Sequence, residues 1–113
     1  MVTRSNEQEV AVREGMRGGK AHVTLQALTS KMPGRVKLFS TLRLIPGASI
    51  GYHRHDGETE LVYILEGKGT VCDDGETYEV QAGDCTATFS GHSHGIENTG
   101  TETLVILGCI VED

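Results

Sequence analysis

The sequence of 113 residues has no tryptophan, two prolines, three cysteines and no long apolar run. No stretch approaches the roughly 20 apolar residues that span a bilayer, so no membrane partner is expected. Residues 1–10 lack the apolar core of a signal peptide, which favours a cytoplasmic protein. The cysteines, Cys72, Cys85 and Cys109, are odd in number and widely spaced, without a CxxC motif. We therefore expect free thiols, mostly buried in strands, and neither disulfides nor a cysteine metal site.

Basic residues are also few. The 10 Lys and Arg stand against 16 Asp and Glu, which gives a formal net charge of −6. An acidic surface without a basic stripe repels phosphate backbones, so nucleic acid is not an expected partner. The sequence also lacks a Gly-rich phosphate loop and a GxSxG motif, which argues against nucleotide-binding and serine-hydrolase chemistry.

Glycine, by contrast, is abundant, with 15 residues that separate about eight short apolar stretches. In residues 36–44 the apolar side chains recur at every second position, as on a half-buried strand. Residues 60–67 form a nearly continuous apolar strand, in which Val62 and Ile64 are expected to face the interior. The dipeptide at residues 74–75, Asp-Gly, favours the turn of a hairpin. Short strands at this spacing predict an all-β fold, either a sandwich or a barrel.

The chain is long enough for one domain but not comfortably for two. Its first 20 residues are polar and charged and end in a Gly-Gly pair, whereas regular alternation begins at Ala21. We therefore interpret residues 1–20 as a flexible N-terminal arm and residues 21–113 as the β-domain.

Four of the 5 histidines form two His-x-His pairs, His53/His55 and His92/His94. On a strand, side chains i and i+2 point to the same face, so the two imidazoles of a pair can reach one ion. Glu60 follows the first pair and can turn its carboxylate to the same point, and an imidazole from a distant strand would complete the site. Imidazole with carboxylate suits first-row transition ions such as Zn, Mn, Fe, Ni and Cu. The alternative is that both pairs lie on solvated strand edges.

Two spaced patterns in the sequence resemble the two signatures of the cupin superfamily. The first has every position filled, by Gly47, His53, His55, Glu60 and Gly67. The second has all positions but one filled, by Gly83, Gly91, His94 and Asn98. The exception is Phe89, where the family usually has proline, in the turn before His94. Together the two patterns cover residues 47–98, nearly half of the chain.

The resemblance implies a single jelly-roll (double-stranded β-helix) barrel that holds one divalent transition metal ion, Zn, Mn, Fe, Ni or Cu. The implied metal ligands are His53, His55, Glu60 and His94. Glu58 shares the parity of Glu60 and is an alternative ligand, whereas Asn98 is expected to close a turn. Single-domain cupins commonly pair, so a homodimer is the expected oligomer.

The same resemblance implies a small-molecule metalloenzyme of the dioxygenase, isomerase or lyase type, because cupins with this ligand set include all three. His92 is the only candidate base for such a reaction, although its position in a turn favours exposure to solvent. The alternatives are a module that binds or senses a small ligand without catalysis, and a structural barrel with a vestigial site. An enzyme needs a proton-transfer group within reach of the pocket, whereas a pure binder does not.

Overall fold

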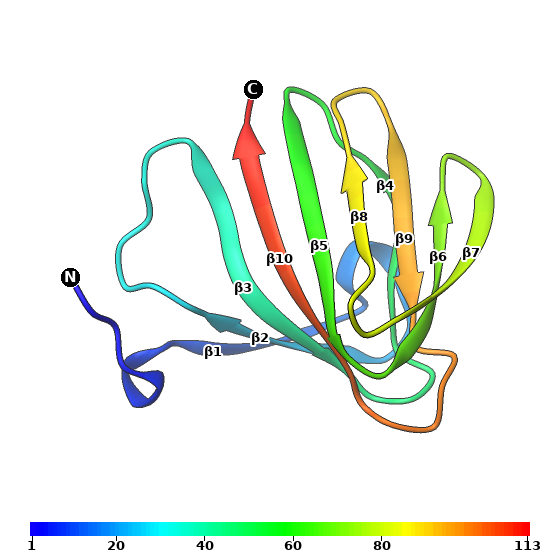
Figure 1. Ribbon diagram of the computed structural model, residues 1–113, viewed down its shortest axis with the longest axis horizontal. Helices are drawn as coiled ribbons and strands as arrows, with labels where there is room; N and C mark the ends of the chain where they lie inside the picture. The colour runs from blue at the N-terminus through cyan, green and yellow to red at the C-terminus, as the bar shows by residue number, and fades with distance from the viewer.

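The computed structural model describes residues 1–113 as ten strands and two single 3-10 turns (Figure 1). The strands are β1 (Val10–Glu14), β2 (His22–Ala27), β3 (Val36–Leu44), β4 (Ser49–Arg54), β5 (Glu58–Glu66), β6 (Lys68–Asp73), β7 (Glu76–Gln81), β8 (Cys85–Thr88), β9 (Ser93–Glu97) and β10 (Leu104–Glu112). The 3-10 turns are η1 (Ser5–Glu7) and η2 (Met16–Gly18). None of these elements is a helix long and apolar enough to span a bilayer.

The strands form two antiparallel sheets that face each other. The 6-stranded sheet has the order β1-β2-β3-β10-β5-β8, and the 4-stranded sheet has the order β4-β9-β6-β7. The last strand, β10, lies between β3 and β5, so strands distant in sequence are neighbours in space (Figure 1). The all-β jelly-roll fold implied by the sequence is therefore confirmed.

The core lies between the two sheets and follows from the period-two pattern of the strands. In β3, every second side chain from Ser40 onward is buried, which places Leu42 and Leu44 in the interior. On β10, Ile106 pairs with Leu42 of β3 on one side and with Ile64 of β5 on the other. These three side chains are 0–1% exposed and form a continuous apolar row across the sheet. The expected inward positions of Val62 and Ile64 are confirmed.

The predicted hairpin is the β6–β7 pair. Asp73 pairs with Glu76, so the connection contains two residues, Asp74 and Gly75. Both have positive φ, 47° and 85°, which is the backbone that a two-residue turn of type I′ requires. Because Asp and Gly adopt this backbone most readily, the dipeptide determines the register of the hairpin.

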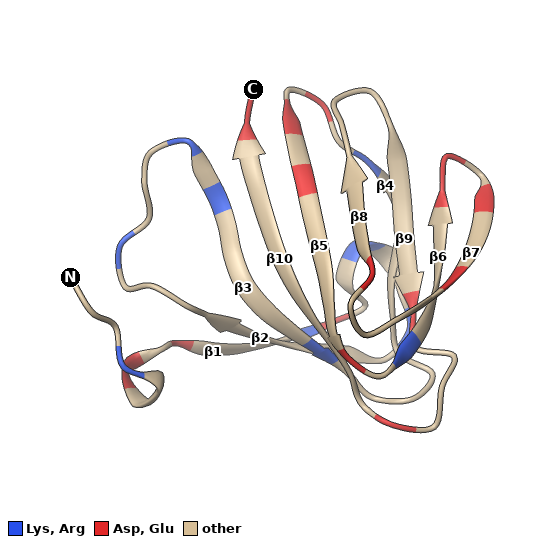
Figure 2. Cartoon of the chain, in the orientation of Figure 1, with Lys and Arg blue, Asp and Glu red and all other residues tan.

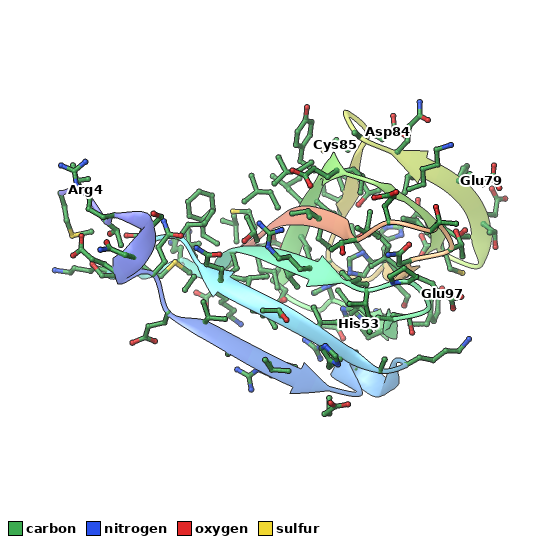
Figure 3. The ribbon with its side chains drawn as sticks, turned by 90° about the horizontal axis from the view of Figure 1, so that it is seen from below. Arg4, His53, Glu79, Asp84, Cys85 and Glu97 are labelled. Atoms are coloured by element: carbon green, nitrogen blue, oxygen red, sulfur yellow. The ribbon has the colours of Figure 1, made fainter.

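The N-terminal residues pack against the barrel at two places. β1 pairs with β2 over its whole length, and η2 contacts β4. Seen from below, η1 and the labelled Arg4 project beyond the barrel, far from Glu79 (Figure 3). The flexibility of residues 1–20 and the domain boundary at residue 20 stay predictions.

The three cysteines are free thiols, as expected. None is fully buried, however: Cys72 and Cys109 are half-buried and Cys85 is exposed. The expectation that most are buried was wrong. Cys85 lies on β8, the edge strand of its sheet, and it does not belong to the buried core.

Charged residues are distributed without a basic stripe. Acidic positions gather on the β6–β7 turn and near several strand ends, whereas Lys and Arg are scattered along the ribbon (Figure 2). This distribution agrees with the negative net charge.

Candidate metal centre

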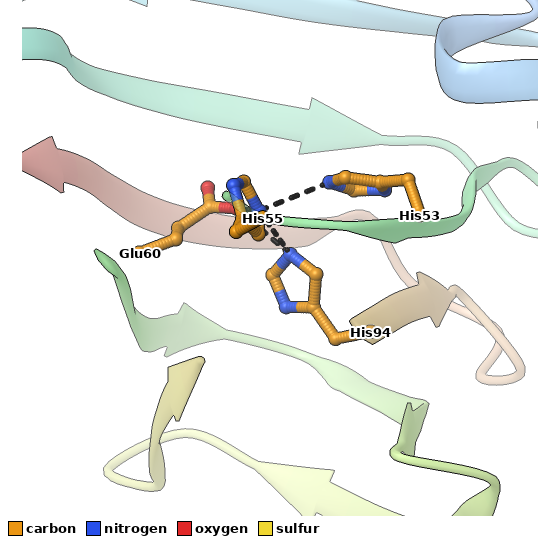
Figure 4. Close-up of side chains that lie close together, drawn as sticks. All are labelled: His53, His55, Glu60 and His94. Carbon is orange, nitrogen blue, oxygen red and sulfur yellow. Dashed lines mark hydrogen bonds and ion pairs between the residues drawn. The ribbon is translucent and has the colours of Figure 1, made fainter. Parts of the chain in front are cut away.

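Four side chains from both sheets point toward one another inside the barrel (Figure 4). His53 lies on β4, directly opposite His94 of the neighbouring strand β9. His55 follows the end of β4, and Glu60 lies on β5 of the other sheet. A register shift between Ile50 and His53 interrupts the β4–β9 pairing just before the first of these clustered residues. The cluster therefore joins the two sheets at a place that neither sheet could form alone.

The four potential ligand atoms lie close together. The Nε2 atom of His55 is 3.2 Å from His53 Nε2, 3.0 Å from His94 Nε2 and 3.0 Å from Glu60 Oε1. His94 Nε2 is 2.9 Å from the same Glu60 oxygen, and all four atoms lie within 4.8 Å of one another. His55, Glu60 and His94 are buried, and His53 is half-buried.

Hydrogen bonds on the opposite side of two rings orient their Nε2 atoms toward the centre. His53 Nδ1 donates to the carbonyl oxygen of Gly51 at 2.6 Å. His55 Nδ1 donates to the Glu58 carboxylate at 2.8 Å. A neutral imidazole that carries its hydrogen on Nδ1 presents a lone pair at Nε2, so both rings are prepared to act as ligands.

The third ring is held in the same way. Thr88 is 1% exposed, and its hydroxyl oxygen lies 2.9 Å from His94 Nδ1, whose hydrogen it can accept. Thr88 also pairs with Glu60 across β8 and β5. The β5–β8 pair therefore places the residue that contacts His94 Nδ1 next to Glu60, another member of the cluster. Each of the three histidines therefore has an outer partner on Nδ1 and a free Nε2.

These residues fit a bound cation. Lone pairs of His53 and His55 face each other and the Glu60 carboxylate, an arrangement that is repulsive unless a positive charge lies between them. Ligand atoms 2.0–2.1 Å from an ion and at right angles to one another lie about 3.0 Å apart. The four short contacts in the cluster, 2.9–3.2 Å, have that spacing.

The electrostatics of His53 favour its neutral, metal-binding form. Burial lowers its pKa below the ordinary value for histidine, and the hydrogen bond to the Gly51 carbonyl opposes this only in part. The neighbouring imidazoles and the Arg17 guanidinium lower the pKa further. Because an imidazolium cannot bind a metal, this depression extends the pH range in which the site can be loaded.

Glu58 lies outside the cluster, although the sequence left it open as a ligand. Its carboxylate accepts from His55 Nδ1 on one side and from Lys37 Nζ, at 3.2 Å, on the other. Burial opposes ionisation of Glu58, but the hydrogen bonds from His55 and Lys37 outweigh it and hold its pKa below the usual range. Glu58 is therefore an anionic partner for His55, which the parity argument from sequence missed.

Removing this outer partner should weaken metal binding without removing a ligand. We expect Glu58→Ala to lower metal affinity by about 10- to 100-fold, because His55 loses the acceptor that orients it. The measurement is competition for the metal with a chromogenic chelator. Glu112→Ala is the matched control, since Glu112 also pairs with Lys37 but does not contact the cluster. Equal affinities in the two variants would contradict the role of Glu58.

His92 is not one of the four clustered residues. It precedes β9, its side chain is 54% exposed, and it pairs with Asp74 in the β6–β7 turn. A hydrogen bond from the Ser93 backbone and the contact with His92 lower the pKa of Asp74. The expectation that His92 is exposed to solvent agrees with this position, whereas its role as a base stays a prediction.

A small cavity of about 50 Å³ adjoins the cluster, and His53, Glu60 and His94 form part of its wall. Of its 15 lining residues, 9 are hydrophobic. Apart from the three clustered residues, Arg17 of η2 is the only lining residue with an ionisable side chain. Sequence reasoning did not single out Arg17, because it precedes the clustered residues by more than 30 positions.

Comparison with known proteins agrees with the fold and the site. The family model described as "Cupin domain" matches residues 40–110. The oxalate-binding protein of Thermotoga maritima is 44% identical over 113 residues, which cover 98% of this chain and 93% of that protein. An uncharacterised protein of Methanocaldococcus jannaschii is 40% identical over 63 residues, which cover 56% of this chain and 50% of that protein.

Comparison with solved structures also agrees with the fold. A crystal structure from Thermotoga maritima, described as that of a predicted oxalate decarboxylase, has a TM-score of 0.94 and 43% identity, with 100% of both chains covered. A cupin from Shewanella frigidimarina has a TM-score of 0.80 at 17% identity, covering 99% of this chain and 90% of that one, and supports the fold alone. The chain belongs to the cupin family, and its three histidines and one glutamate form a cluster able to bind a metal ion.

Proposed function

We propose that this protein binds one divalent transition metal ion through His53, His55, Glu60 and His94, and that the ion anchors a small carboxylate such as oxalate. The observation that carries the proposal is the convergence of three Nε2 atoms and one carboxylate oxygen beside a small cavity, whose wall includes His53, Glu60 and His94. The descriptions of the curated Thermotoga maritima protein and of the Thermotoga maritima crystal structure both refer to oxalate, which supports the choice of ligand.

The spacing of the ligand atoms supports an ion with six-coordinate preference. In a tetrahedral site with metal–ligand distances near 2.1 Å, all four ligand atoms would lie about 3.4 Å apart. The four contacts of 2.9–3.2 Å are shorter and resemble adjacent corners of an octahedron. An ion with this preference, such as Mn, Fe or Ni, would leave two positions for ligand oxygens, and we propose it in preference to tetrahedral Zn.

The cavity supports binding over catalysis. Decarboxylation of oxalate breaks the C–C bond and releases CO₂, and the remaining carbon must receive a proton to become formate. Among the lining residues, only the metal ligands and Arg17 are ionisable, and Arg17 does not give up its proton in proteins. A binding protein needs no such donor, so the binding alternative is favoured.

An enzyme of the lyase, isomerase or dioxygenase type is the second candidate. Two open coordination positions would allow a bound substrate to react, and the relative described as a predicted oxalate decarboxylase favours the lyase class. In that case His92 is the proposed base, and the adjoining loop would have to bring it to the cavity.

The test combines metal analysis with calorimetry. Protein purified without a histidine tag should contain close to stoichiometric Mn, Fe or Ni, or take it up on reconstitution. The loaded protein should bind oxalate, and protein stripped by a chelator should not. Formate production from oxalate would replace the binding proposal with the lyase. Failure of the loaded protein to bind oxalate would overturn the choice of ligand.

We also propose a homodimer that lies in the cytoplasm. The outer face of the 6-stranded sheet exposes Phe39 on β3 and Leu61, Tyr63 and Leu65 on β5. Phe39 and Leu61 both pair with Cys109 of β10, so they lie in one row across the sheet. A row of partly exposed apolar side chains on a sheet is a suitable surface for a second copy of the chain.

A further inference from the structure

Residues 15–19, which contain η2, approach β4 more closely than any side chain would allow. A Cβ atom added to Gly19 would lie 2.0 Å from the carbonyl oxygen of Ser49, and one added to Gly51 would lie 2.1 Å from that of Arg17. Glycine at both positions is therefore required for this contact. The backbone N–H of Lys20 donates to the Ser49 hydroxyl at 2.8 Å, and the Ser49 N–H donates to the Lys20 carbonyl at 3.0 Å.

The contact holds Arg17 in an unusual backbone conformation. Its φ and ψ are 55° and 31°, in the left-handed region that a long side chain rarely adopts. The neighbouring Gly15 and Gly18 also have positive φ, and Gly18 N–H donates to the Gly15 carbonyl at 2.8 Å. Such conformations persist where surrounding contacts impose them, and they concentrate at binding sites.

The result is a positive charge on the wall of the cavity that adjoins the cluster. Arg17 lines the cavity together with His53, Glu60 and His94, yet its side chain is exposed to solvent. The ion pairs of the chain's Lys and Arg side chains involve Lys20, Lys37 and Arg54, so the Arg17 guanidinium has no carboxylate partner. In an acidic protein, an unpaired Arg beside an apolar cavity has its hydrogen-bond donors available to a ligand.

We propose that Arg17 binds a carboxylate group of the ligand and makes the site selective for small anions. A guanidinium donates two parallel hydrogen bonds to a carboxylate, and these are stronger than hydrogen bonds between neutral groups. The cavity of about 50 Å³ limits the ligand to a few non-hydrogen atoms, which suits a small dicarboxylate. This inference rests on the proposed function and adds the residue that recognises the negative charge.

The test is calorimetry with oxalate on the metal-reconstituted full chain. Arg17→Gln should bind oxalate at least about tenfold more weakly, because it loses the charge-assisted hydrogen bonds. Its metal content and melting temperature should match those of the wild type. Arg13→Gln is the matched control, since Arg13 is also an exposed arginine near the N-terminus but lies on β1 and not on the cavity wall.

The outcomes separate the two proposals. Equal oxalate affinity in wild type, Arg17→Gln and Arg13→Gln would overturn the role of Arg17 and leave metal-dependent binding intact. Absence of binding by the loaded wild type would overturn both. If Arg17→Gln lost its metal or its cooperative melting, Arg17→Lys would decide. Weaker binding by a folded, loaded lysine variant would support recognition by the guanidinium, and unchanged binding would overturn it.

Discussion

His94→Ala should lose most of its metal. The Nε2 atom of His94 lies within 3.0 Å of both His55 Nε2 and Glu60 Oε1, so its removal opens the centre of the cluster. The three remaining ligands would come from β4, the residue that follows it and β5, and the 4-stranded sheet would lose its contribution from β9. We expect the affinity to fall by more than the roughly 100-fold that loss of an outer partner can cost.

Metal content measured by mass spectrometry on purified protein tests this directly. His92→Ala is the control, because it removes an imidazole two positions away that is exposed and outside the cluster. The control should retain wild-type metal, and melting curves should show that both variants fold. Normal occupancy in folded His94→Ala would contradict the four-ligand site.

Asn98→Ala should destabilise the fold by about 2–4 kcal/mol, since it removes the three hydrogen bonds of a buried side chain and leaves a void. Asn98 is 1% exposed, and its Nδ2 donates to the carbonyl oxygens of Leu44 and Glu102, each at 2.8 Å. Its Oδ1 accepts from the Gly100 N–H at 3.0 Å. One side chain thus joins the end of β3 to the β9–β10 loop, and the carbonyls of Leu44 and Glu102 would both lose this donor.

Urea and thermal unfolding measure this effect. A loss of this size should lower the melting temperature by on the order of 10 °C in a domain of this length. Asn6→Ala, in the exposed η1 turn, should change stability by less than about 0.5 kcal/mol. If Asn98→Ala unfolded at the same urea concentration as the wild type, the side chain would not stabilise the loop.

Much of the fold follows from local pattern. The alternation in residues 36–44 and the apolar run in residues 60–67 predict strands, and Asp74-Gly75 predicts a two-residue turn, because each depends only on neighbouring residues. The order of the strands does not follow from such patterns. The all-β prediction left a sandwich and a barrel open, and the jelly roll came from the resemblance to cupins.

The site shows the same division. The spacing of His53, His55 and Glu60 indicates a metal site, because the three lie within eight residues on one strand and the start of the next. The residues that contact the Nδ1 atoms of the histidines could not be predicted from spacing. Thr88 carries no signal in the sequence, and Glu58 was interpreted through its parity with Glu60 instead of its contact with His55.

The sequence by itself determined the class of fold and predicted that His53, His55 and Glu60 lie together in a metal site, since these depend on period and spacing along one segment. The resemblance to cupins already favoured His94 over His92, and the tertiary structure shows the physical reason, because β9 begins at Ser93 and His94 is buried in the cluster. Only the tertiary structure brought Arg17 to the cavity, through a close approach of two glycine backbones from distant segments. Contacts between distant segments depend on how the sheets close, and no local pattern encodes that closure.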